Sequence, residues 1–170
     1  MTDRVDRVPV RLLFTTGDDP FQNAIRKGTR SNATHAALAL GHHGEMLLHA
    51  YEDGVQLDPR ERWLGQERQR LIAEYQILPD VTDGVFHAMS HVGKRYDVLH
   101  VAKIVVMRLF RLVRLGRPET NDAFTCARFV MMIDPHGDVI DEWKGVNPEA
   151  VVPVDLLDVA DHGESFYRVG

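Results

Sequence analysis

Residues 34–51 read THAALALGHHGEMLLHAY and contain the clearest hairpin pattern of the chain. Two apolar runs, Thr34 to Leu40 and Glu45 to Tyr51, flank the segment Gly41-His42-His43-Gly44. Paired glycines supply the positive φ angles that a tight connection between strands needs, so the stretch predicts a β-hairpin. His35 and His49 each lie seven residues from position 42, inside the predicted turn. The two histidines are therefore expected to be cross-strand neighbours on one face, with Cβ atoms about 5 Å apart.

The rest of the chain supplies further strands and several helices. Further strands are predicted at Val8–Thr16, Arg70–Leu78 and Ser165–Val169. Helical spacing of apolar residues predicts helices at Pro20–Arg30, 81–92, Val98–Leu115, Cys126–Ile133 and from Pro153 onward. Strands come first, helices follow and one strand closes the order, which indicates an α+β fold with a mainly antiparallel sheet packed against helices. No linker or internal repeat divides residues 1–170, so we expect a single domain.

Composition narrows the classes of function. The 170 residues are 44% hydrophobic and 26% charged, which is typical of a globular domain. A net charge of -5 removes the basic field that nucleic-acid binding usually requires, so no nucleic-acid partner is expected. No apolar segment approaches the roughly 20 residues that span a bilayer. The N-terminus has no signal-peptide core, so we expect the protein to be cytoplasmic.

The single cysteine, Cys126, cannot form an internal disulfide and must act, if it acts, as a free thiol. Thr125 before it is a good N-cap residue, which would make Cys126 the first residue of a helix. The N–H groups and the helix dipole at that position favour a thiolate, so a lowered thiol pKa is expected. A thiol, a histidine base and a polar orienting group are the components of nucleophilic acyl-transfer catalysis, and Cys126 and the two paired histidines could supply them. The alternative is that Cys126 is a small buried hydrophobe.

A family resemblance rests on short motifs in a specific order. They are Thr29-Arg30-Ser31-Asn32-Ala33-Thr34-His35-Ala36-Ala37-Leu38, Leu48-His49-Ala50, Gly54-Val55, Lys94-Arg95-Tyr96-Asp97, Phe124-Thr125-Cys126-Ala127-Arg128-Phe129-Val130 and Val152-Pro153-Val154-Asp155-Leu156. Together they resemble the circularly permuted NlpC-type, papain-like cysteine hydrolases of the YiiX-like group, in which the histidine precedes the cysteine. The similarity extends from about Val10 to the C-terminus.

The resemblance implies a permuted papain-like domain in which Cys126 is the nucleophile, His35 the base and His49 the orienting residue. YiiX-like members commonly have Glu where this chain has His49, whereas the related lecithin retinol acyltransferase-like proteins have a second histidine. The first group implies amide or peptide bonds and the second implies lipid acyl chains. The expected function is therefore hydrolysis or acyl transfer at an amide, peptide or ester bond through a cysteine thioester, without a cofactor or metal.

Three other hypotheses stay open. His87 and His91 have helical i, i+4 spacing and could share a zinc ion, but no third ligand is marked. Residues 98–115 combine apolar and basic side chains and could contact an anionic membrane surface, as a lipid-directed acyl hydrolase would require. The same fold could also serve as a non-catalytic binding module. The bond cleaved, the choice between a small-molecule, peptide or lipid acyl substrate, and the oligomeric state stay open.

Overall fold

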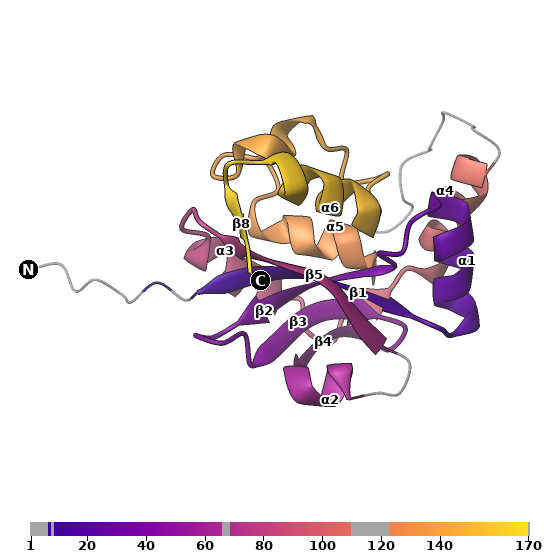
Figure 1. Ribbon diagram of the computed structural model, residues 1–170, viewed down its shortest axis with the longest axis horizontal. Coiled ribbons are helices and arrows are strands. Elements are labelled where there is room, and N and C mark those ends of the chain that lie inside the picture. Colours follow the sequence, from indigo (N-terminus) through magenta and orange to yellow (C-terminus); the bar gives the residue numbers. More distant parts are fainter. Residues whose placement is uncertain (1–6, 8, 66–68, 110–122, 170) are drawn as a thin grey trace, which may run out of the picture.

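A computed structural model describes residues 7, 9–65, 69–109 and 123–169 of the chain. Its centre is a six-stranded antiparallel sheet in the order β4-β3-β2-β1-β5-β8 (Figure 1). The strands are β1 (Val10–Gly17), β2 (His35–Leu40), β3 (Met46–Tyr51), β4 (Gly54–Pro59), β5 (Gln69–Ile77) and β8 (Phe166–Arg168). Two short strands, β6 (Arg95–Tyr96) and β7 (Ala123–Phe124), pair in parallel beside it. This arrangement confirms the predicted α+β class and the antiparallel sheet.

Helices cover both faces of the sheet and lie at two of its ends (Figure 1). Helices α5 (Cys126–Val130) and α6 (Pro153–His162) lie over one face, and α2 (Arg60–Leu64) lies under the other (Figure 1). Helices α1 (Pro20–Thr29) and α4 (Val98–Leu109) pack together at one end, while α3 (Thr82–Met89) lies at the opposite end. Short 3-10 helices at Met131–Ile133 and Asp141–Gly145 follow α5.

Side-chain alternation along the strands separates two apolar layers. Leu12 and Leu38 belong to the large core beneath α5 and α6, whereas Leu13 and Ala39 contact Trp63 of α2 on the other face. Successive residues of a strand point to opposite faces, so the nearly continuous apolar runs of β1 and β2 allow both faces to be buried. Every residue of β2 is buried, as expected for a central strand covered on both sides.

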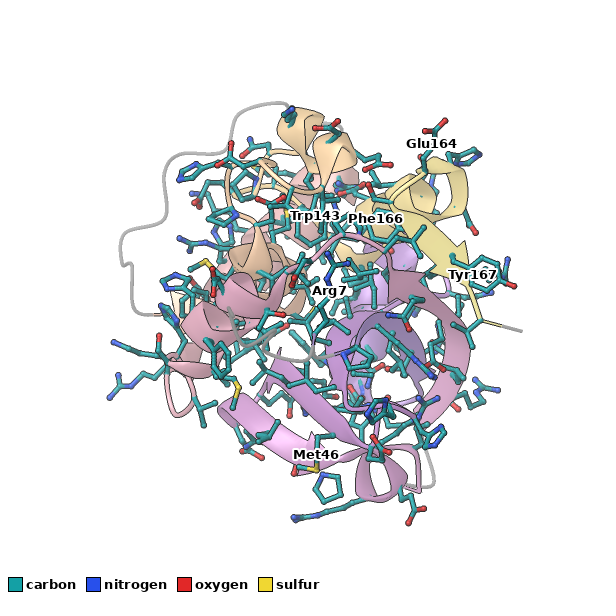
Figure 2. All side chains as sticks on the ribbon, turned by 90° about the vertical axis from the view of Figure 1, so that its left-hand side faces the viewer. Arg7, Met46, Trp143, Glu164, Phe166 and Tyr167 are labelled. Atoms are coloured by element: carbon teal, nitrogen blue, oxygen red, sulfur yellow. The ribbon has the colours of Figure 1, made fainter. Side chains whose placement is uncertain are left out.

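A pair of aromatic side chains closes the core where the C-terminal region returns to the sheet. Trp143 and Phe166 lie side by side with ring centroids 6.4 Å apart (Figure 2). Trp143 comes from the 3-10 helix at Asp141–Gly145, and Phe166 begins β8. Their contact joins the last strand to the segment that follows α5. Each ring covers apolar surface of the other that would otherwise be exposed to water.

Charged side chains connect the hairpin turn to strands β1 and β5. Glu74 of β5 is 6% exposed and receives hydrogen bonds from Arg11 at 3.0 Å and from Arg60 at 2.8 and 2.7 Å. Arg11 also donates to the carbonyl of His42 in the turn. The carboxylate is thus buried with two guanidinium partners, as a buried charge requires.

The outer edge of β4 is partly covered by the turn that precedes β6. The N–H of Val55 donates to the carbonyl of Lys94 at 2.8 Å, and the N–H of Gly93 donates to the carbonyl of Val55 at 2.9 Å. Gly54 has a φ of 108°, and an added Cβ would lie 2.4 Å from the same Lys94 carbonyl oxygen. Glycine is therefore needed at position 54 for both the backbone conformation and the close approach.

The sequence missed β4 and α2, the short strands β6 and β7, and the 3-10 helix at Asp141–Gly145. Most other predicted elements appear with ends shifted by a few residues; the helix predicted for 81–92 is shorter as α3. The helix predicted for Cys126–Ile133 is α helical to Val130 and continues as a 3-10 turn. Of the helix predicted for Val98–Leu115, residues 98–109 form α4, and 110–115 lie outside the described residues.

Gly84 permits the close approach of α3 to the chain after α5. A Cβ at this position would lie 1.7 Å from the carbonyl oxygen of Ile133. Although alanine is the better helix former, we expect Gly84→Ala to lower the free energy of unfolding by about 3 kcal/mol because the backbones must separate. Gly145→Ala is the control, since its Cβ meets nothing within 4 Å. Urea unfolding of both variants measures the effect, and equal stability would contradict it.

Candidate active site

The candidate site lies where β2 and β3 separate. Direct pairing joins Leu38 to Leu48, Ala39 to Leu47 and Leu40 to Met46, although β2 begins at His35 and β3 ends at Tyr51. This register differs by two residues from the predicted one, so His35 and His49 are not directly opposite. Because side chains alternate with a period of two, a two-residue offset leaves both histidines on the same face.

The two histidines nevertheless meet across the gap and continue to a carboxylate. Nε2 of His35 lies 3.1 Å from Nδ1 of His49, and Nε2 of His49 lies 3.2 Å from Oδ2 of Asp58 on β4. The rings of His35 and His49 are 1% and 0% exposed. Trp63 packs against both rings, with centroid distances of 5.1 and 4.4 Å. The result is a buried row of three polar side chains on the α2 face of the sheet.

Burial keeps both imidazoles neutral. Removal from water lowers the pKa of His35 well below its usual value, and the neighbouring His49 lowers it further. The pKa of His49 is also lowered by burial, although its hydrogen bond and charge interaction with Asp58 act in the opposite direction. A neutral imidazole has one N–H donor and one acceptor nitrogen, so hydrogen bonding along the row has a direction.

Cys126 begins α5 as the sequence predicts. The Thr125 side chain accepts a hydrogen bond from the N–H of Arg128 at 3.2 Å, which confirms the predicted cap. The cysteine is 3% exposed, and burial raises the pKa of its thiol. The N–H of Ala36 and the hydroxyl of Tyr96 lower that pKa, but less than burial raises it. The expected lowered thiol pKa is therefore wrong: loss of water outweighs the donors at this five-residue helix.

The structure brings the two histidines together on the α2 face of the sheet, whereas Cys126 begins the helix that covers the opposite face, beside the same strand β2. Ala36, whose main chain lowers the pKa of the Cys126 thiol, directly follows His35. Within the described part of the chain, no hydrogen bond joins Cys126 to either histidine, and Nδ1 of His35 has no hydrogen-bond partner. Contact between Cys126 and His35 stays a prediction.

Two hollows border the site from opposite sides. An open groove of about 530 Å³ is lined by Asp58, Trp63 and Tyr51, together with Asp53, Val55, Gln56, Leu57, Arg62, Val92 and Gly93. A narrow apolar slot lies beside the thiol and is lined by Ile25, Tyr96, Val101, Ile104, Val105, Thr125, Cys126, Ala127, Val151, Val152 and Pro153. The groove reaches the Asp58 end of the polar row, and the slot reaches Cys126.

The sequence did not identify Asp58 or the position of Tyr96 against the thiol. Asp58 lies on β4, which was not predicted, and it comes two residues after Gln56, the direct partner of His49. Strand alternation after Gly54 is the signal that would have placed Asp58 on the histidine face. Tyr96 lies beside the thiol; burial raises the pKa of its hydroxyl well above the usual value, and Cys126 raises it further.

Further observations concern the zinc and membrane hypotheses. Among residues 7, 9–65, 69–109 and 123–169, no group of three His, Cys, Asp or Glu side chains is arranged to hold a metal ion. The rings of His87 and His91 are adjacent, with centroids 4.9 Å apart. In the same part of the chain, no helix is both long enough and apolar enough to span a membrane.

The comparisons with known proteins assign no family to the chain, so its function is argued from the geometry of the site. No family model matches the chain, and no curated protein matches it.

The neutral buried histidines make stability depend on pH. In the unfolded chain a histidine takes up a proton below its ordinary pKa of about 6.5, but folded His35 and His49 take it up only at lower pH. The unfolded state thus binds more protons, so stability falls as pH drops below 6.5, by up to about 1.4 kcal/mol per pH unit for each group. Urea unfolding between pH 7 and 5 measures this slope. We expect a smaller slope in His35→Gln, and an unchanged slope would contradict burial of a neutral His35.

Proposed function

We propose that the protein is a cysteine hydrolase or acyltransferase that acts on an amide, peptide or ester bond, with Cys126 as nucleophile, His35 as base and His49 as the residue that orients the base. The observation that carries the proposal is the position of the thiol. Cys126 begins α5, which packs on β2, and it lies in the same buried cluster as Ala36, the residue next to His35. With Nε2 of His35 engaged by His49, Nδ1 is the nitrogen that remains to accept a proton.

The raised pKa of the thiol determines how the reaction begins. Cys126 rests as a thiol and His35 as a neutral imidazole, so the proton moves from Sγ to Nδ1 as sulfur attacks the substrate carbonyl. The imidazolium then gives its proton to the leaving nitrogen or oxygen, and the carbon–leaving-group bond breaks to form a thioester. Water or another acceptor donates a proton to Nδ1, attacks the thioester and releases the acyl group, which restores the thiol.

The observed fold supports assignment to the permuted papain-like class. Helix α5, which begins with the proposed nucleophile, packs on β2 and β3, which carry the two histidines. The chain order of histidines first and cysteine later fits the permuted NlpC-type resemblance. A cytoplasmic enzyme of this class that acts on a small-molecule, peptide or lipid acyl substrate, without nucleic acid, is the function we propose.

The apolar side chains of α4 favour a lipid acyl group as a second candidate substrate, although the slot beside Cys126 has a volume of only about 10 Å³. Val101, Ile104 and Val105 on the inner side of α4 line the slot beside Cys126. The outer side of α4 exposes Leu99, at 83%, and Val106, at 48%. Contact with a membrane surface through residues 98–115 would need such an apolar outer side. Residues 110–115 lie outside the described part of the chain.

Acylation of Cys126 tests the proposal directly. Incubation of the folded protein with p-nitrophenyl esters of graded chain length, and with peptide p-nitroanilides, should add one acyl mass at Cys126, read by mass spectrometry. We expect His35→Ala to slow acylation by about 100-fold because the base is lost, and His49→Ala to slow it less. His42→Ala is the matched control, since His42 is an exposed histidine in the turn. Its rate should equal that of the wild type.

Thiol reactivity separates the enzyme from a binding module. Iodoacetamide should alkylate Cys126 in the folded protein, with a rate that increases toward alkaline pH because burial raises the thiol pKa. Modification only after denaturation, together with no acyl adduct, would reject Cys126 as nucleophile and favour the binding module.

A further inference from the structure

We propose that Asp58 is a positioning residue that fixes the tautomers of His49 and His35, and so leaves the lone pair of His35 Nδ1 available to the nucleophile. The tautomer assignment follows from hydrogen-bond geometry, whereas its use in catalysis rests on the proposed function. Asp58 does not touch the nucleophile, and its effect passes through two imidazole rings.

The first step is the bond between Asp58 and His49. A carboxylate has acceptor oxygens and no proton to donate. Nε2 of His49, 3.2 Å from Oδ2 of Asp58, must therefore carry the proton. The His49 ring is completely buried, so no alternative water partner competes for this N–H. The position of the Asp58 carboxylate thus selects one of the two neutral forms of His49.

The second step passes this selection to His35. A neutral His49 with its proton on Nε2 has an acceptor at Nδ1, and His35 Nε2 lies 3.1 Å away. The proton of His35 must then lie on Nε2 and be donated to His49. His35 Nδ1 is left with a lone pair, which is the form that a general base needs. In the opposite tautomer, Nδ1 of His35 carries the proton and cannot accept another.

The surroundings leave the Asp58 end of the row partly open to water and the histidine end dry. Asp58 is 19% exposed along its side chain and lines the open groove of about 530 Å³. Nη1 of Arg62 lies 3.8 Å from its other oxygen, Oδ1. Trp63 packs edge to face against His49 and restricts rotation of the ring. A solvated carboxylate therefore acts on two histidines that are shielded from water.

The test measures where the protons lie, independently of catalysis. Nitrogen-15 NMR of histidine-labelled protein distinguishes a protonated from an unprotonated ring nitrogen, and His35→Gln and His49→Gln assign the signals. In the wild type we expect His35 and His49 both to carry the proton on Nε2. Asp58→Leu removes the acceptor, so His35 should populate the form protonated on Nδ1. Iodoacetamide alkylation of folded Cys126 should then slow by about tenfold, because the base is partly blocked.

Asp53→Leu is the matched control. Asp53 lines the same groove and carries the same charge, but it is exposed and does not bond to either histidine. It should leave the tautomers and the alkylation rate unchanged. A wild-type His35 protonated on Nδ1 would overturn the proposal without any variant, which covers the case in which Asp58→Leu does not fold. Unchanged His35 tautomers in a folded Asp58→Leu variant would also overturn it.

The two proposals fail in different ways. If the tautomers depend on Asp58 as expected but wild-type Cys126 forms no acyl adduct, the control of His35 by Asp58 stands and the enzymatic function fails. If Cys126 is acylated through His35 but the histidine tautomers do not depend on Asp58, the enzymatic function is supported and the positioning role of Asp58 is rejected.

Discussion

A buried N–H group needs an acceptor, and this requirement organises the region around β2, β3 and β4. His35 and His49 are removed from water by the sheet, by Trp63 and by the core, so each N–H must find its partner within the protein. The row ends at Asp58, where the protein surface begins. Because each ring can satisfy its neighbour in one direction only, a single carboxylate at the end of the row determines the arrangement of all three groups.

The same burial explains why the cysteine differs from a simple helix-start thiol. Main-chain donors and the Tyr96 hydroxyl favour the thiolate, whereas the apolar slot opposes any charge beside it. The opposing effect wins because α5 is short and Cys126 lies beneath surrounding helices. Proton transfer to the histidine therefore accompanies bond formation in the proposed reaction, in place of a preformed ion pair. The burial of Cys126 in the fold thus determines when its proton is transferred in the proposed reaction.

The sequence predicted the helices and strands that follow from the spacing of apolar residues. It missed elements that depend on tertiary contacts. The histidines share a face under any register that differs by an even number of residues, so the incorrect register of the hairpin did no harm. Strand β4 was missed because its polar Gln56 and Asp58 and its final Pro59 weaken the apolar signal, and with it Asp58 was lost. Helix α2 has five residues and no side-chain cap, so local signals do not mark it. The pKa of Cys126 depends on neighbours distant in sequence, which local capping rules do not include.

The two edges of the main sheet have a consequence for how the protein behaves in a crowded solution. A free strand edge offers its N–H and C=O groups to strands of other chains, and this is a common start of aggregation. At one edge, the turn at Gly93 and Lys94 already occupies both groups of Val55 on β4. At the other edge, β8 has three residues, too short to serve as a long template. Strand pairing between copies is therefore disfavoured at Val55 and along β8, which covers Tyr75, Gln76 and Ile77 of the nine-residue β5.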